Sequence, residues 1–274
     1  MGEVVWAACV SHAGGQLRVR QSEREQDKLD RVYAGWERLR DSLAQARPDA
    51  LVVVGNDHMF TFSEDLMPTF TIGRGEGFET WGELGNTIRP LPGAAALADE
   101  LHGALVSAGF DVSGMPGMRL DHSYACPLEF LDPADAIPLV PLSVNTFVRP
   151  LPSFARCRQL GIALADAIAA QTVAERVAVV ATGGISHWIG VPETGRINPE
   201  WDRWFLDLFE APDLAALDGM SEAQFVAGGG PGAGELLCWM VALGAAGSHG
   251  GRRLLYEPVE EWITGISLVE MELT

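Results

Sequence analysis

Six histidines are spread along this chain, and four of them share one setting. Each of the four lies in a loop containing glycine or aspartate that follows, or lies between, apolar segments. These four are His12, His58, His122 and His187. An imidazole binds metal ions or exchanges a proton near neutral pH, so four in matching positions predict one reactive site. A single loop histidine is usually an ordinary hydrogen-bonded residue, and we interpret His102 and His249 in that way.

A metal site built on these histidines also needs a carboxylate that balances the charge of the ion. Two imidazoles and one carboxylate leave coordination positions open, which is the ligand set of non-haem Fe(II) oxygenases. Glu235 is the best candidate, because it follows Gly232 and Gly234 and precedes the apolar stretch LLCWMVAL. The alternative, which the spacing alone favours, is an acid in the first turn of a helix, where it complements the helix dipole.

Apolar runs precede three of the four histidines and indicate the strands that must position them. The runs are 4–10 before His12, 51–54 before His58 and 176–181 before His187. Short apolar runs rich in β-branched residues are typical of buried strands in a parallel sheet. Ligands gather at the carboxyl ends of such strands, so we expect these histidines to lie along one edge of the sheet.

Helical periodicity and turn residues predict the elements between these strands. Residues 23–46 are expected to form an amphipathic helix, which completes a βαβ unit. Further helices are expected at 93–108, 157–170, 201–209 and 234–245, and further strands at 137–144, 254–259 and 266–273.

Two segments are predicted to lack regular structure. Residues 60–92, rich in glycine, proline and aromatics, contain only the short strand-like PTFTIG and are typical of a lid or substrate wall. Residues 119–130 are predicted to form a loop. Because no repeat or linker interrupts the chain, we expect a single α/β domain over residues 1–274. It would have three layers, α/β/α, around a largely parallel or mixed sheet, with the active site at the carboxyl ends of the strands.

Composition excludes some classes of partner. The formal net charge is −18 and no basic patch stands out, so neither nucleic acid nor an anionic membrane is an expected partner. The four cysteines show no CxxC spacing and are interpreted as reduced thiols of a cytosolic protein. The N-terminus shows no leader pattern, and the apolar runs are far short of the ~20 residues of a membrane span. A cytoplasmic location is therefore expected.

Several segments together resemble one known family. They are SHAGG, VVVGNDHMFTF, MPTFTIG, DHSYACPLEF, IPLVPLSVN, ATGGISHW, INPEWDRWFLD and GELLCWMVALGA. In this order they resemble the class III extradiol ring-cleaving dioxygenases, most closely the catalytic β-subunit of protocatechuate 4,5-dioxygenase. The combination of NDH, TGGxSH and INxEWD is specific, whereas any one of these motifs alone would not be.

The resemblance implies a role for each candidate residue. His12, His58 and Glu235 match the ligands of Fe(II). His187 matches the base that takes a proton from the substrate hydroxyl, and His122 matches a second histidine of the pocket, assigned an acid role in some relatives. Possible hydrogen-bonding residues around the site, with core or capping roles as the alternative, are Asn56, Asp57, Ser186 and Asn198.

The resemblance also implies a reaction. An O2-dependent enzyme would cleave the ring of a catechol-like substrate beside its two neighbouring oxygens and release a semialdehyde-type acid. Protocatechuate- or gallate-type diols, aminophenols and hydroxypyridones are all candidate substrates. A carboxylated substrate would need a cation in the pocket, and the loop candidates are Arg74, Arg119, Arg149 and Arg196. The expected protein partner is a second copy of the chain or a small helical α-subunit. Three tryptophans are expected to be exposed and to serve either an interface or a substrate wall, and they are Trp81, Trp188 and Trp201.

Two alternatives from other classes stay open at this point. One is a relative of the same fold that binds ligands without catalysis, against which the presence of Glu235 beside both histidines argues. The other is a zinc-dependent hydrolase, because zinc accepts three protein ligands of these types and one water.

Overall fold

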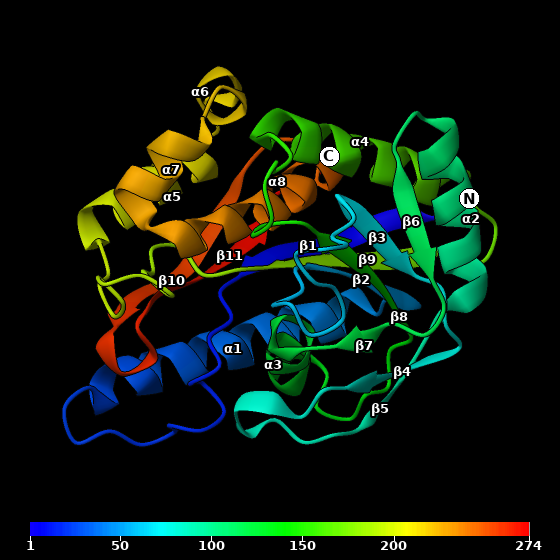
Figure 1. Cartoon of the computed structure of the whole chain (residues 1–274). Helices are drawn as coiled ribbons and strands as arrows, with labels where there is room; N and C mark the ends of the chain where they lie inside the picture. The colour runs from blue at the N-terminus through cyan, green and yellow to red at the C-terminus, as the bar shows by residue number, and fades with distance from the viewer. Residues whose placement is uncertain (274) are drawn as a thin grey trace.

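A central eight-stranded sheet positions every other element of the molecule (Figure 1). The computed structural model describes residues 1–273. The strand order across the sheet is β10 (Gly251–Val259), β11 (Thr264–Met271), β1 (Glu3–Val10), β9 (Arg176–Thr182), β2 (Ala50–Gly55), β8 (Leu139–Val144), β3 (Phe70–Gly73) and β6 (Val112–Met115). The four middle strands, β1, β9, β2 and β8, are parallel, while β11 and β3 pair antiparallel to their flanks. The sheet is therefore mixed, as predicted.

The middle strands are apolar throughout because both faces of the sheet are covered. Along β2, Val52 and Val54 contribute to one hydrophobic core, whereas Leu51 and Val53 contribute to the core on the opposite face. This alternation follows from the two-residue period of a strand. A strand with one face in water alternates apolar and polar residues. The continuous apolar runs of these strands therefore indicate that both faces of the sheet are covered.

Helices cover both faces of this sheet, which confirms the predicted three-layer α/β/α arrangement (Figure 1). One face is covered by α2 (Ala95–Ser107), α4 (Phe154–Ala170) and α8 (Leu236–Ala245), and the other by α1 (Gln26–Ala46) and α3 (His122–Leu131). All ten residues of α8 are buried, because this helix lies between the sheet and α4. Residues of α5 (Pro199–Glu210), α6 (Leu214–Asp218) and α7 (Glu222–Gly229) contribute to the same hydrophobic core as α4 and α8.

The two segments predicted to be irregular are more ordered than expected. Residues 60–92 include β3, β4 (Gly77–Thr80) and β5 (Pro90–Pro92). Together with β7 (Arg119–Leu120), the last two form a second sheet in the order β5, β4, β7. Between β4 and β5 lies the short 3-10 helix η1 (Glu83–Gly85). The predicted loop at 119–130 is wrong for most of its length, since α3 begins at His122 despite Pro127 in its middle.

Two further observations bear on the predictions from composition. Within residues 1–273, no helix combines the length and the apolar character needed to cross a bilayer. The four cysteines, which are Cys9, Cys126, Cys157 and Cys238, are all buried as free thiols.

Candidate active site

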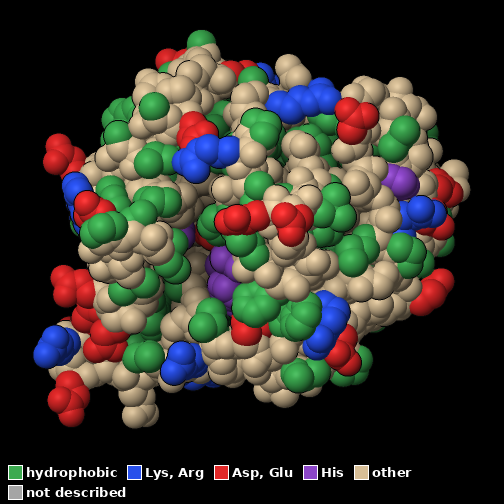
Figure 2. All heavy atoms as spheres, viewed as in Figure 1, with side chains coloured by type: hydrophobic (Ala, Val, Ile, Leu, Met, Phe, Trp, Pro, Cys, Tyr) green, Lys and Arg blue, Asp and Glu red, His purple; other side chains and the backbone are tan. Residues whose placement is uncertain are grey.

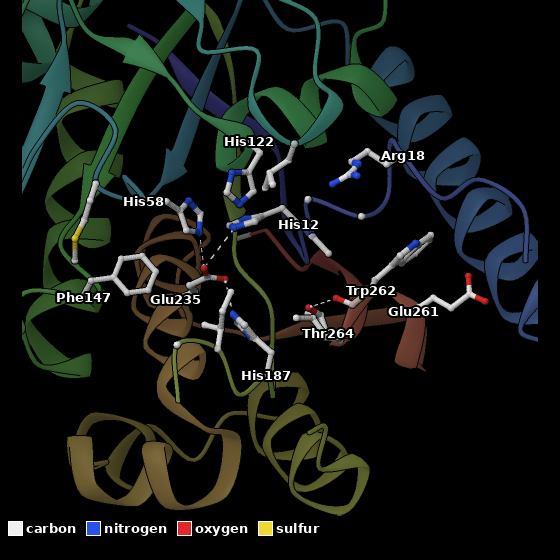
Figure 3. Close-up of a pocket in the computed structure, with 18 residues that line it drawn as sticks. His12, Arg18, His58, His122, Phe147, His187, Glu235, Glu261, Trp262 and Thr264 are labelled. Carbon is white, nitrogen blue, oxygen red and sulfur yellow. Dashed lines mark hydrogen bonds and ion pairs between the residues drawn. The ribbon is translucent and has the colours of Figure 1, made fainter. Parts of the chain in front are cut away.

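Four histidines and Glu235 meet at one end of the parallel strands (Figure 3). His12, His58 and His187 follow the carboxyl ends of β1, β2 and β9, so the parallel pairing of these strands brings the three loops together. The site lies in a cavity of about 720 Å³. Figure 2 shows histidine side chains at the bottom of a hollow in this face of the molecule. The predicted location at the strand ends is thus the location observed.

His58 is oriented by a carboxylate that the sequence prediction missed. Its Nδ1 lies 3.0 Å from Oδ2 of Asp121, and the same oxygen accepts the backbone N–H of His58 at 2.7 Å. The other ring nitrogen, Nε2, lies 3.1 Å from Oε1 of Glu235. Although burial by itself lowers the pKa of His58, Asp121 and Glu235 together raise that pKa to about 10. A metal ion that replaced the proton on Nε2 would be held by Glu235, while Asp121 would keep its hydrogen bond to Nδ1.

His12 is held in a corresponding way. Its Nδ1 lies 3.2 Å from the hydroxyl of Thr182, at the end of β9, and its Nε2 lies 3.4 Å from Oε1 of Glu235. That Nε2 is buried and, within residues 1–273, makes no hydrogen bond of acceptable geometry. Burial lowers the pKa of His12, so the ring is neutral and keeps a lone pair available for an ion.

Glu235 lies at the centre of the cluster, with 1% of its surface exposed. It ends the 3-10 helix η2 (Pro231–Glu235) and immediately precedes α8, so the predicted helix at 234–245 begins two residues later. Its Oε2 accepts the backbone N–H of Gly184 at 2.6 Å. Burial opposes ionisation, but the imidazoles of His12 and His187 outweigh it and hold the pKa of Glu235 well below its usual range.

His122 stacks on His58, with ring centroids 4.0 Å apart. It is the first residue of α3, and its Nδ1 lies 3.0 Å from Oε1 of Glu83 in η1. The backbone N–H of His122 donates to the same oxygen. A ring nitrogen of His122 lies within 4.8 Å of ring nitrogens of His12 and His58. His122 therefore faces the cluster while its outer side is fixed by Glu83, another residue that the sequence prediction missed.

His187 approaches Glu235 from the opposite wall, with its Nε2 3.8 Å from Oε2 (Figure 3). Its backbone is fixed by two hydrogen bonds, from its N–H to the Gly229 carbonyl and from the Gly232 N–H to its own carbonyl. A Cβ atom at Gly232 would lie 2.1 Å from Nε2 of His187, so only glycine leaves room for the ring. Burial lowers the pKa of His187, which keeps the imidazole neutral near pH 7.

The four residues predicted to support the site differ in their distance from it. Nδ2 of Asn56 lies 3.4 Å from Nε2 of His58 and 3.5 Å from Oε1 of Glu235. The carboxylate of Asp57 instead accepts the backbone N–H groups of residues 61 and 62.

The other two lie behind His187 and do not line the cavity. Ser186 donates its backbone N–H and its hydroxyl to Asp202, at 2.9 and 2.8 Å. Asn198 caps α5, with its side chain accepting from Trp201 and donating to the Gly228 carbonyl. Both residues shape the loop that carries His187.

The walls of the cavity are mostly apolar, and they include residues that the sequence did not single out. Phe147 packs beside His58, with centroids 5.3 Å apart, and Leu84, Ile189 and Trp262 line other walls. None of the three tryptophans considered from the sequence lines the cavity. The prediction that they are exposed is wrong, since Trp188 is buried and Trp81 and Trp201 are half-buried.

The four arginines considered as anchors do not line the cavity either, so that prediction is also corrected. Each has another partner: Arg74 pairs with Asp99, Arg119 with Glu79, Arg149 with Glu222, and Arg196 lies over the Trp188 ring. The arginine that does line the cavity is Arg18.

The donor set fits a divalent metal ion. In both His12 and His58 the Nδ1 atom is occupied by an outer partner, which leaves Nε2 directed at one carboxylate oxygen of Glu235. Metal-binding histidines have this arrangement, in which an outer hydrogen bond fixes the ring and the tautomer. The buried Nε2 of His12, which makes no hydrogen bond to residues 1–273, gains a partner if an ion binds.

Comparison with known proteins assigns the chain to a class of enzymes. Residues 6–267 match the family described as "Catalytic LigB subunit of aromatic ring-opening dioxygenase". The chain belongs to this LigB family. The predicted enzyme class, a ring-cleaving dioxygenase of the extradiol type, is confirmed at the level of the family.

Individual relatives cover nearly the whole chain. The 2,3-dihydroxyphenylpropionate/2,3-dihydroxicinnamic acid 1,2-dioxygenases of Klebsiella pneumoniae and of Escherichia coli K12 are each 28% identical to it. Each match covers 94% of this chain and 95% of the relative. The crystal structure of uncharacterized protein JW3007 from Escherichia coli K12 aligns with a TM-score of 0.66 over 97% of this chain and 99% of that one. At 20% identity, that likeness concerns the fold alone.

Proposed function

We propose that the chain, as a single catalytic domain over residues 1–274, is an Fe(II)-dependent extradiol dioxygenase acting on a catechol-like substrate. The observation that carries this proposal is the approach of two Nε2 atoms, from His12 and His58, to one oxygen of Glu235. Two neutral imidazoles and one carboxylate on one face are the ligand set of non-haem Fe(II) oxygenases. When bound there, Fe(II) would supply open positions at which both substrate oxygens and O2 bind.

His187 is suited to take the proton that a substrate hydroxyl releases on binding. It is neutral because burial lowers its pKa, and it faces the cluster from the wall opposite His58 (Figure 3). Its Nδ1 is buried and makes no hydrogen bond of acceptable geometry to the described residues. His122, with Nδ1 fixed by Glu83, presents its other ring nitrogen toward the cluster, where it could donate a hydrogen bond to a substrate oxygen.

The remaining walls suit an aromatic ring. Phe147, Leu84 and Trp262 provide apolar surface around the histidines, and a cavity of about 720 Å³ falls in the usual range for small-molecule sites. Apolar walls also exclude water from the reacting groups. We further propose that the chain works as a homo-oligomer or with a small helical α-subunit in the cytoplasm.

Oxygen uptake across a panel of substrates tests this function. The purified protein would be loaded anaerobically with Fe(II) and given catecholic acids, aminophenols and hydroxypyridones, with a zinc-loaded sample as control. We expect oxygen consumption matched by a ring-opened product only in the iron sample. His12→Ala and Glu235→Gln should lose bound iron and turnover together. Full iron content and activity in either variant would remove that residue from the ligand set.

A zinc-dependent hydrolase is the second candidate, because one observation favours it. The imidazoles of His12, His58 and His122 offer nitrogens within 4.8 Å of one another, and three histidines are a ligand set of catalytic zinc. Hydrolysis by the zinc-loaded protein without oxygen consumption by the iron-loaded one would support this candidate. In that case His122→Ala would lower metal content, whereas the dioxygenase proposal expects the metal to be retained in that variant.

A further inference from the structure

Arg18 lines the cavity, and none of residues 1–273 forms an ion pair with it. Of the eighteen residues that line the cavity, Arg18 is the only one with a permanent positive charge. Within residues 1–273, no carboxylate lies within ion-pair distance of its guanidinium, which also donates no hydrogen bond to the protein. Figure 3 shows Arg18 on the side of the cavity away from Phe147, with its guanidinium directed inward. The cation is therefore available to a bound molecule.

The aliphatic part of Arg18 is held in place by the neighbouring segment. A Cβ atom at Gly85 would lie 2.5 Å from Cγ of Arg18, so the arginine stem packs directly against the Gly85 backbone. Gly85 has φ +87°, a conformation that glycine adopts without strain. The Arg18 side chain is exposed, and this contact holds its aliphatic carbons beside the cavity.

The other charged groups of the lining are already engaged. Glu235 faces the histidines, and Glu261 accepts a hydrogen bond from the hydroxyl of Ser22. The cavity lining thus combines the largely buried cluster of candidate metal ligands, apolar residues, and the exposed cation of Arg18, which is unpaired among the described residues. At about 720 Å³ it is much larger than the roughly 150 Å³ that holds a benzene ring, so a substrate with a side chain has room to reach Arg18.

We infer that Arg18 binds an anionic group, in the first place a carboxylate, on a side chain of the aromatic substrate. This inference rests on the proposed function, because the diol end of the molecule is taken to lie at the histidines. A guanidinium presents paired N–H donors that match both oxygens of a carboxylate. Arg18 is then a specificity-determining residue, which selects acids over neutral analogues without taking part in proton transfer.

Binding of an acid and its ester tests this role directly. The probes are 3-(2,3-dihydroxyphenyl)propionate and its methyl ester, which differ in charge but keep the same ring and chain. Calorimetric titration under anaerobic conditions compares the wild-type protein, Arg18→Gln and Arg24→Gln. Arg24 is a matched control, because it is an exposed arginine of the same segment that does not line the cavity.

We expect the wild-type protein to bind the acid at least about tenfold more tightly than the ester. Hydrogen bonds between charged groups generally strengthen binding by about that factor or more. Arg18→Gln should reduce this preference to within about twofold, and Arg24→Gln should retain it. The preference should also fall with added salt, because Arg18 is exposed. Equal binding of acid and ester by the wild-type protein, or an unchanged preference in Arg18→Gln, would overturn the inference.

Oxygen uptake with the same two probes separates this inference from the proposed function. If the acid is preferred through Arg18 but no iron-loaded sample consumes oxygen with any substrate of the panel, the proposed function fails and the anion site stands. If both probes are turned over with equal kcat/KM in the wild-type protein and in Arg18→Gln, the function stands and the anion site fails.

Discussion

Oδ2 of Asp121 accepts two hydrogen bonds from His58, one from the backbone N–H at 2.7 Å and one from Nδ1 at 3.0 Å. The other oxygen of Asp121 caps α3 by accepting the Ser123 N–H at 2.9 Å. One carboxylate thus fixes both the histidine ring and the helix that begins with His122. Since Asp121 is 1% exposed and the imidazole of His58 lowers its pKa despite burial, it is ionised in the folded protein.

Asp121→Asn should weaken metal binding by roughly 10- to 100-fold, because outer partners of metal-bound histidines contribute about that much. Competition with a chelator, followed by metal analysis, measures the change. Asp132→Asn is the matched control, since Asp132 ends the same helix and accepts the Ile137 N–H far from the ring. An unaltered metal affinity in the Asp121 variant would show that the carboxylate only caps α3.

Replacement of His187 should separate proton transfer from metal binding. His187→Ala is expected to retain the metal and to lose roughly 100- to 10,000-fold in kcat, the range for a positioned acid or base. Metal content and steady-state oxygen uptake are the two measurements. A variant that lost its metal instead would place His187 among the ligands and leave the role of base to another group.

Gly232 offers a second way to disturb His187 without changing its chemistry. In Gly232→Ala, the new methyl group would occupy space 2.1 Å from Nε2, so the ring must move and kcat should fall while metal content stays the same. Gly103→Ala is the control, because a Cβ atom there meets nothing within 4 Å and α2 should gain about 1 kcal/mol. Full activity in Gly232→Ala would mean that the position of this ring is not critical.

Asp202, behind His187, should make stability depend on pH. Burial raises its pKa from 3.8 to about 6, while hydrogen bonds from Tyr256 and Ser186 act in the opposite direction. The folded state therefore holds the proton more tightly than the unfolded chain. Its contribution to stability is complete below about pH 4 and is lost as the pH rises through 6.

Urea unfolding at pH 5 and pH 7, both above the pI of 4.6, measures this contribution. Over this interval the wild-type protein should lose roughly 1 to 2 kcal/mol relative to Asp202→Asn, which cannot ionise. Comparing the two proteins cancels the titration of the histidines. A difference in the free energy of unfolding that stays constant with pH would mean that Asp202 keeps an ordinary pKa when folded.

Elements with one dominant signal were predictable from the sequence. The apolar runs of β1, β2, β8 and β9 are buried on both faces, so composition alone identified them as central strands. The parallel pairing of β1, β9 and β2 then brings the loops of three histidines together. These loops lie far apart in the sequence, so local sequence patterns do not show that they are close in space. The position of Glu235 made it a candidate carboxylate, but the spacing alone favoured an acid at a helix terminus, and only the resemblance implied that it is a ligand.

Residues whose signals conflict were not predictable. Pro127 argues against a helix, so α3 was missed and Asp121 was not recognised as its cap. The strands β4, β5 and β7 have four residues or fewer and depend on pairing with each other for their stability. Arg18 was not among the arginines considered from the sequence, since its place in the cavity lining is visible only in three dimensions.

The candidate ligand Glu235 and Asp121, which fixes the candidate ligand His58, come from opposite sides of the central sheet. Asp121 and His122 lie at the start of α3 on one face, and Glu235 lies at the start of α8 on the other. A bound ion would therefore cross-link the two helical layers beyond the ends of the strands. The melting temperature should then rise with the concentration of metal. Dialysis against a chelator should lower the stability of both helical layers together rather than that of a single loop.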